Sequence, residues 1–294
     1  MILVTGGTGF LGKALVPELE KIDDVRVMSR GEKKDSFSGF SGAEIVKADI
    51  TDKKQVAKAM KGADYVFHLA KFKGHNYPYE KHYPTTVLGT RNVVECAVKE
   101  DVEKLIHMSS AGVEMKNITP YSAAKEEAEV TVMRRWHELT MPIIRSTMIY
   151  DRSVIKKLNR YTYLPFPHVK QKVHMAYKGA VVRALVNAMK YGKSDVYYAL
   201  DKRSIMLTQL MKEIASPRPV IPIPAQTIYL LAALGYPVKY IFNAAGAKPP
   251  FTPEFVRYTF EDRSFDIAKS VKILKYNPVD TIDTVKKIKR GEPL

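Results

Sequence analysis

The chain contains a single cysteine, Cys96, so it forms no internal disulfide and suits a reducing compartment. Acidic residues are also scarce, because 31 Asp and Glu face 47 Lys and Arg, which gives a formal net charge of +16. This surplus permits a nucleic acid, an anionic membrane surface or a phosphorylated ligand as partner, and it selects none of them. No charged leader with an apolar core precedes Ile2, so we expect no secretion signal and a cytoplasmic location.

A long uninterrupted apolar run is missing as well. Residues 219–238 carry no charge, but four prolines interrupt them. The apolar residues that remain number about a dozen, too few to cross a bilayer. We expect a buried or lid helix there, with an interfacial segment or the wall of an apolar substrate site as the alternative. A peripheral contact with an anionic membrane surface therefore stays open.

The sequence also lacks the usual ligand sets for a metal. Its histidines have no Cys or carboxylate partner at metal-ligand spacing, so we predict no metal site. The basic surplus is partly local, since residues 151–200 hold ten Lys and Arg against two Asp. Because no recognisable nucleic-acid module accompanies these basic residues, we expect no nucleic acid as partner.

The chain does have a regular alternation of apolar runs and helical patterns up to residue 150. Apolar runs predict strands at 1–5, 25–29, 64–69, 104–109 and 142–147. Helical patterns lie between them, at 10–21, 53–61, 85–100 and 121–139. Strand–helix alternation of this length predicts an α/β fold, a doubly wound parallel sheet with helices on both faces.

The second half of the chain is less regular, which indicates a division into two parts. We predict a dinucleotide-binding domain of the Rossmann type over residues 1–150. Residues 173–200, which have the pattern of a helix followed by a strand, are expected to return to it. Residues 151–172 and 201–294 are expected to form a smaller substrate lobe.

The most informative stretch is TGGTGFLG, which starts at residue 5 and directly follows the first predicted strand. Its glycines form a G-x-x-G-x-x-G turn that opens a helix. Glycine lets such a turn tighten and lets the backbone approach a pyrophosphate, while the helix N-terminus offers free N–H groups to the anion. This context predicts a dinucleotide site. The residues of the turn assigned to the dinucleotide are Gly6, Thr8, Gly9, Phe10, Leu11 and Gly12.

The end of the second predicted strand bears on which dinucleotide binds. NAD-preferring sites place Asp or Glu about 20 residues past the glycine turn, where the acid binds the ribose 2′-OH. Ser29 and Arg30 stand there instead, and a guanidinium can bind a 2′-phosphate with paired hydrogen bonds. Glu32 lies close in the sequence, and an acid there would favour NAD(H). We predict NADP(H), with NAD(H) as the alternative.

Tyr121 and Lys125 lie four residues apart in a predicted helix, so they share one face. A free tyrosine, with a pKa of about 10, is a poor acid–base catalyst at neutral pH, and a nearby ammonium stabilises its phenolate. Ser110, at a predicted strand end, can hydrogen-bond a substrate oxygen. We expect Tyr121 to pass a proton to or from that oxygen while a nicotinamide carries the hydride, and Lys125 to hold the cofactor ribose as well.

TGGTGFLG followed by Tyr121-x-x-x-Lys125 resembles the extended short-chain dehydrogenase/reductase superfamily. This superfamily includes nucleotide-sugar epimerases and dehydratases, 3β-hydroxysteroid dehydrogenases and dihydroflavonol-type reductases. Further segments resemble its motifs in order, and they are VKADITD, VFHLA, TVLGTRNVVECA, HMSSAGV, IIRSTMIY, KVHMAYKGAVVRAL and FDIAKSVKILKYNP. The resemblance implies a helix-mediated homodimer as a common assembly. The further cofactor contacts that it implies are Asp49, Ile50, Leu69, Ala70 and Met148.

Several departures from the superfamily's motifs favour its 3β-hydroxysteroid dehydrogenase and dihydroflavonol reductase branch. Thr86 replaces the usual Asn of N-V-x-G-T, and Ser146 replaces the Pro after the nicotinamide-side Arg. Tyr177 stands near the place of the Asp in V-H-V-x-D. Because nucleotide-sugar enzymes usually keep more of these features, we predict an NAD(P)-dependent oxidoreductase. It would interconvert a secondary alcohol and a ketone on a largely apolar small-molecule substrate.

Two other functions remain open at this point. A nucleotide-sugar epimerase or dehydratase uses the same triad but returns the hydride to its own substrate. A non-catalytic dinucleotide sensor or assembly subunit commonly loses the Tyr-x-x-x-Lys pair, which is intact here. The identity of the substrate, the direction of the reaction and the oligomeric state, a homodimer included, stay open with them.

Overall fold

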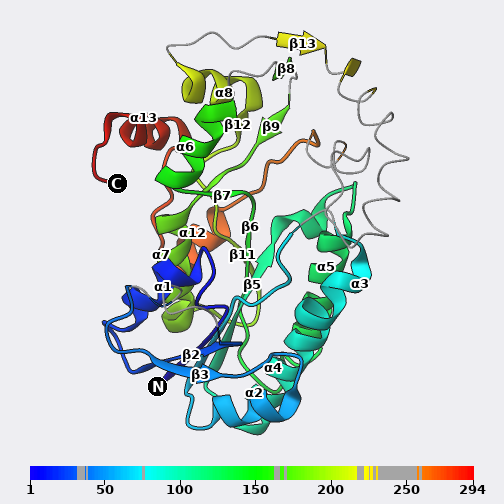
Figure 1. Ribbon diagram of the computed structural model, residues 1–294, viewed down its shortest axis with the longest axis vertical. Helices are drawn as coiled ribbons and strands as arrows, with labels where there is room; N and C mark the ends of the chain where they lie inside the picture. The colour runs from blue at the N-terminus through cyan, green and yellow to red at the C-terminus, as the bar shows by residue number, and fades with distance from the viewer. Residues whose placement is uncertain are drawn as a thin grey trace.

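The computed structural model of the chain is an α/β structure built on one large sheet (Figure 1). The residues that it describes are 1–31, 37, 39–74, 77–161, 166–168, 171–216, 222–224, 226–227, 230, 257 and 260–294. Most of 219–238, expected as a lid helix or an interfacial segment, lies outside the described residues, and so does Glu32.

The sheet has seven parallel strands in the order β11-β6-β5-β4-β1-β2-β3. Their bounds are β1 Ile2–Thr5, β2 Val25–Ser29, β3 Glu44–Lys47, β4 Tyr65–His68, β5 Lys104–Ser110, β6 Ile143–Ser146 and β11 Val196–Tyr198. The predicted doubly wound parallel sheet is confirmed. The strand order reverses between β1 and β4, where Ile2 lies opposite Tyr65. Ligands of such sheets bind outside the carboxyl ends of the strands at this reversal.

Helices cover both faces of the sheet (Figure 1). One face carries α2 (Lys53–Met60), α4 (Gly89–Lys99) and α5 (Pro120–Met133), and the other carries α1 (Gly12–Leu19), α7 (Lys178–Tyr191) and α12 (Ala268–Leu274). The helices bury apolar side chains against the strands, for example Val93 and Val132 on the first face and Leu15 and Leu185 on the second. Burial of these side chains is the main force that fixes the two layers.

Capping residues set where the site's helices begin. The hydroxyl of Thr119 accepts a hydrogen bond from the backbone N–H of Ser122, and Pro120 occupies the first position of α5. A threonine cap followed by proline is a typical helix start. Tyr121 is therefore the second residue of α5, at the end of the helix that lies nearest the carboxyl edge of the sheet.

A second group of elements lies above the sheet in Figure 1. Its helices, α6 (Arg152–Tyr161), α8 (Leu207–Ala215) and α13 (Thr281–Arg290), contact one another around their own apolar cluster. Three short strand pairs accompany them, which are β7 Ile149–Tyr150 with β10 Ala176–Tyr177, β9 Lys172–Val173 with β12 Ile205–Met206, and β8 Phe166–His168 with β13 Pro222–Pro224. In the part of the chain that the structure describes, no helix combines the length and apolar character needed to cross a membrane.

Candidate active site

The glycine-rich turn joins β1 to α1 and lies against the turn that follows β4. Gly6 has a φ of 73°, and a Cβ there would lie 2.7 Å from the backbone nitrogen of Ala70. A Cβ at Gly12 would lie 2.4 Å from the carbonyl oxygen of Gly7. Backbone atoms cannot move far enough to relieve such short contacts, so both positions require glycine. The two glycines leave the backbone of the turn and the N-terminus of α1 open to a ligand at positions where a Cβ does not fit, which suits a pyrophosphate.

Two further turns at the same edge carry residues that the sequence assigned to the cofactor. The N–H of Leu69 donates a 3.0 Å hydrogen bond to the carbonyl of Thr5, which keeps the turn after β4 beside the glycine-rich turn. After β3, the carboxylate of Asp49 accepts hydrogen bonds from the N–H and the hydroxyl of Thr51, at 2.9 and 2.8 Å. Ile50 beside it is buried. The Asp49 carboxylate thus shapes its own turn.

The remaining residues assigned to the cofactor differ in exposure. Ser29 is buried at the end of β2, and Arg30 directly after it is exposed. Leu11 is buried in the glycine-rich turn and Thr8 is half-buried. Phe10 is 45% exposed and projects from the turn. Because the Arg30 side chain is exposed at the end of β2, a ligand can reach it.

The elements that carry the predicted catalytic residues, α5 and β5, contact each other. Tyr121 and Lys125 lie one turn apart in α5, and both are buried. The ammonium of Lys125 donates a 2.6 Å hydrogen bond to the carbonyl of Met108, two residues before Ser110. Ser110 ends β5, and its hydroxyl oxygen accepts the N–H of Gly112 at 3.1 Å. The structure thus attaches the Tyr121–Lys125 face of α5 to the strand that ends in Ser110.

Burial controls the charges in this region. It lowers the pKa of Lys125 to about 7, and the nearby charge of Lys71 adds to the effect while that of Glu129 opposes it. Burial also lowers the pKa of His68 to about 3 and that of His107 well below its usual value, and the charge of Lys125 contributes to both shifts. The two histidines are therefore neutral at pH 7. Lys125 is the group whose charge changes near neutral pH.

Two side chains that the sequence analysis did not assign to the site flank the ring of Tyr121. The ammonium of Lys71 lies 5.0 Å from the ring centroid. On α3 (Tyr79–His82), the buried His82 ring meets the Tyr121 ring edge-on, with centroids 5.9 Å apart. The signal for Lys71 was its position directly after the VFHLA segment. His82 carried no motif, since only the packing of α3 against α5 brings it there.

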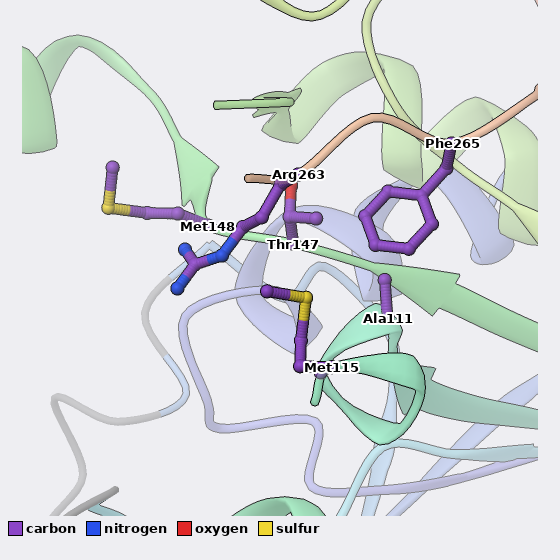
Figure 2. Close-up of a pocket in the computed structure, with 7 residues that line it drawn as sticks. Ala111, Met115, Thr147, Met148, Arg263 and Phe265 are labelled. Carbon is purple, nitrogen blue, oxygen red and sulfur yellow. The ribbon is translucent and has the colours of Figure 1, made fainter. Parts of the chain in front are cut away.

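A pocket opens at the ends of β5 and β6, next to the turn that follows Ser110 (Figure 2). Its lining comes from the 3₁₀ turn η3 (Ala111–Glu114), from the segment after β6 and from the segment before α12, and consists of Ala111, Gly112, Met115, Thr147, Met148, Arg263 and Phe265. Met148 was assigned to the cofactor from sequence. Arg263 and Phe265 were missed, because the hydrogen bond from the Arg263 N–H to the Lys172 carbonyl (3.0 Å) brings this distant segment to the sheet edge.

A buried ion pair anchors an arginine that also contacts η3. Arg145 of β6 donates to the carboxylate of Glu129 on α5, with the shortest nitrogen–oxygen distance at 2.6 Å. The same guanidinium bonds the carboxylate of Glu114, the last residue of η3, and the hydroxyl of Tyr198 at 3.2 Å. One arginine therefore joins β6, β11, α5 and the turn that follows Ser110. Among the described residues, no three His, Cys, Asp or Glu gather so as to hold a metal ion.

Comparisons of the sequence with known proteins find similarity to two kinds of enzyme. The model of the 3-beta hydroxysteroid dehydrogenase/isomerase family matches residues 3–140. The chain is 27% identical to 3beta-hydroxysteroid-dehydrogenase/decarboxylase isoform 1 of Arabidopsis thaliana, over 94% of this chain and 76% of that protein. It is 28% identical to the UDP-glucose 4-epimerase of Rickettsia akari, over 65% of this chain and 54% of that protein. The chain thus spans about half the length of the epimerase relative.

Solved structures share the whole fold at low sequence identity. The crystal structure of gox2253 superposes with a TM-score of 0.80 at 22% identity, covering 99% of this chain and 97% of that chain. The structure of MoeE5 in complex with UDP-glucuronic acid and NAD superposes with a TM-score of 0.72 at 19% identity, covering 99% of each chain. These similarities support the fold of the described residues, the second group of elements included.

Proposed function

We infer that this chain, which belongs to the extended short-chain dehydrogenase/reductase superfamily, interconverts a secondary alcohol and a ketone with the help of a nicotinamide dinucleotide. Its relatives are enzymes of that superfamily. The observation that carries the inference is the contact of the Tyr121–Lys125 face of α5 with β5, whose last residue is Ser110. A sensor or assembly subunit would need the glycine-rich turn but would not need this acid–base group.

The residues present suit the dinucleotide along the carboxyl edge of the sheet. The glycine-rich turn and the N-terminus of α1 would hold the pyrophosphate, and the ends of β2 and β3 would hold the adenosine half. Lys125 and Met148 lie on the opposite side, toward β5 and β6. When bound, the nicotinamide supplies the hydride acceptor or donor that side chains lack. The NAD of the MoeE5 complex supports NAD(H), whereas Arg30 in place of an acid supports NADP(H), which we propose as the preferred form.

The side chains would bind the reacting oxygen and transfer its proton. The hydroxyl of Ser110 keeps its own hydrogen free to donate to that oxygen, because its contact with Gly112 uses only the oxygen lone pair. Tyr121 would give the proton to the oxygen during reduction and take it during oxidation. Lys125, an ammonium in a buried place, would favour the phenolate form of Tyr121 and bind the ribose of the cofactor.

Three of the seven residues that line the pocket support an apolar part of the substrate. Met115, Met148 and Phe265 present apolar side chains beside the end of β5. Burying apolar surface there would contribute roughly 25 cal/mol per Å² before the costs of binding. The similarity to the plant 3beta-hydroxysteroid-dehydrogenase/decarboxylase fits such a substrate.

A nucleotide-sugar epimerase or dehydratase is the second candidate. Arg263 lines the same pocket, and a guanidinium suits a phosphate through paired hydrogen bonds. The Rickettsia relative and MoeE5 with its UDP-glucuronic acid fit this reading equally well.

One assay separates the two candidates. Purified protein is mixed with NADP(H) or NAD(H) and a panel of hydrophobic ketones and alcohols, and the nicotinamide absorbance is followed over time. Our proposal predicts a steady net change with at least one hydrophobic pair. Parallel incubation with UDP-glucose and UDP-glucuronic acid is analysed by chromatography. Conversion of the sugar nucleotides without net change in absorbance, and no reaction of the ketone panel, would establish the second candidate instead.

A further inference from the structure

Glu261 joins two segments that lie far apart in the sequence and border the same pocket. The backbone N–H groups of Lys116 and Asn117 donate to its two carboxylate oxygens, at 2.5 and 2.9 Å. The side-chain amide of Asn117 donates a third hydrogen bond at 2.7 Å. Burial raises the pKa of Glu261, but the hydrogen bonds from Asn117 and Lys116 lower it below its usual value, so the carboxylate is charged at pH 7. One charged side chain thus holds the turn between η3 and α5 against the segment before α12.

The backbone around Glu261 is attached to the second group of elements. The carbonyl of Glu261 accepts the side-chain amide of Gln171 at 3.0 Å. The carboxylate of Asp262 accepts the N–H of Lys172 at 2.7 Å, and the N–H of Arg263 donates to the carbonyl of Lys172. These bonds run to β9 and the residue before it, whereas the bonds of the Glu261 carboxylate run to the turn that leads into α5. Glu261 therefore connects two parts of the structure beside the pocket.

The two segments that Glu261 connects form opposite walls of the pocket. Met115 directly precedes Lys116 in the chain, and Arg263 follows Glu261 by two residues. Both Met115 and Arg263 line the pocket, and Figure 2 shows Arg263 descending from the upper segment and Met115 on the turn below it. Because one or two residues of backbone span at most about 7 Å, the contact limits how far the walls can separate. The width of the pocket thus depends on this carboxylate.

We propose that Glu261 is a positioning residue that sets the width of the substrate pocket and thereby selects substrates by size. The inference rests on the proposed function, because it takes this pocket as the place where the ketone or alcohol binds. With the carboxylate in place, the two walls are held together and can contact a compact ring from both sides. Without it the walls can separate, so a compact ligand loses contacts while a bulkier ligand gains room.

Two ketones that share one ring test the proposal by binding. The probes are 4-methylcyclohexanone and 4-tert-butylcyclohexanone. Their dissociation constants are measured by isothermal titration calorimetry on protein loaded with the oxidised dinucleotide, which cannot reduce them. In Glu261→Ala we expect the ratio of the two constants to shift by about tenfold in favour of the bulkier ketone, the lower end of what one methylene group changes in a shaped apolar pocket. Glu261→Gln, which retains one acceptor oxygen and the length of the side chain, should shift the ratio less.

Glu20→Ala is the matched control. The Glu20 carboxylate also accepts backbone N–H groups, but it lies at the end of α1, and its donors are Ser41, Gly42 and Ala43. Its removal should lower stability in a similar way and leave the ratio for the two ketones unchanged.

Thermal unfolding and dinucleotide titration of each variant come first, so that a loss of folding or of dinucleotide binding is recognised separately. If Glu261→Ala does not fold, Glu261→Gln decides by the same criterion. Ketones that bind the wild type with a ratio that stays unchanged in the Glu261 variants, or that shifts equally in Glu20→Ala, would overturn the proposal. No binding of either ketone to the loaded wild-type protein would overturn it as well, and the ketone and alcohol panel described above then decides the proposed function separately.

Discussion

The ammonium of Lys125 donates a 2.6 Å hydrogen bond to the carbonyl oxygen of Met108, and this bond joins α5 to β5 at the candidate active site. It gives the buried ammonium one backbone partner in a place where burial lowers its pKa to about 7. A charged group held there at a cost in stability is typical of functional sites. The same relationship fixes where Tyr121 stands relative to the end of β5.

The low pKa of Lys125 predicts how stability changes with pH. The ordinary lysine value is 10.5 and the folded value is about 7, so between them the unfolded chain binds a proton that the folded protein lacks. The free energy of unfolding should therefore rise as the pH increases from about 7 towards 10. Lys125→Met removes this contribution and should be most stabilising, relative to wild type, below about pH 7. Urea unfolding of the cofactor-free protein at several pH values measures it. A pH slope identical in wild type and variant contradicts the prediction.

Gly12→Ala tests the glycine-rich turn. The added Cβ would lie 2.4 Å from the carbonyl oxygen of Gly7, so the turn must shift. We expect a loss of stability of roughly 1–3 kcal/mol and a larger loss of dinucleotide affinity. Gly42→Ala is the matched control, because its Cβ meets nothing within 4 Å. Thermal unfolding and fluorescence titration with the dinucleotide would show the contrast, and dinucleotide affinity unchanged in Gly12→Ala would speak against this turn as the binding site.

Glu129→Ala tests the buried ion pair that holds η3. It leaves the buried guanidinium of Arg145 without its main partner, and we expect a loss of about 3–5 kcal/mol in unfolding free energy. Glu138→Ala removes an acid from the exposed pair with Arg135 and should cost less than about 1 kcal/mol. Denaturant titrations of both variants give the comparison. Equal losses would mean that the Arg145 network does not fix the turn after Ser110.

Arg30→Ala tests the choice of dinucleotide. If the guanidinium binds the 2′-phosphate, the affinity for NADP(H) should fall by about tenfold or more, because a charged hydrogen bond contributes about 1.5–3 kcal/mol. The affinity for NAD(H), which has no such phosphate, should change little. Arg91→Ala, which removes an exposed arginine of α4, serves as the charge control. Wild-type protein that binds both dinucleotides equally would exclude the predicted preference.

The sequence predicted the central strands well because most of their side chains are buried, whereas β3, whose side chains are mostly exposed, was not predicted. The run predicted over 25–29 was observed as β2 at Val25–Ser29, and four of its five residues are buried. Helix ends were less exact. The pattern at 85–100 became α4 from Gly89, preceded by a π-helical segment, η2 (Tyr83–Leu88), whose hydrogen-bond spacing has no signature in apolar periodicity.

The second half of the chain was harder, since its elements are short and gain stability only from one another. Strand pairs of two residues, such as β9 with β12, are too short to show alternation. The candidate site likewise contains residues that the sequence predicted and residues that only the structure reveals. Its motif residues lie on strand ends and one helix face, and spacing together with the resemblance to the superfamily predicted them. His82 depends on the packing of α3 against α5, and Arg263 on a backbone contact with Lys172, and neither leaves a pattern in the sequence.

Tyr121→Phe is the most direct test of the account, because it removes the hydroxyl that moves the proton and keeps the buried ring. Turnover of the ketone or alcohol found in the panel is measured beside dinucleotide affinity, with Tyr65→Phe at the amino end of β4 as the control. We predict that turnover falls by about 10²–10⁴ while dinucleotide affinity stays within about twofold. Tyr65→Phe should retain full turnover. Unchanged turnover in Tyr121→Phe would contradict the proposed chemistry.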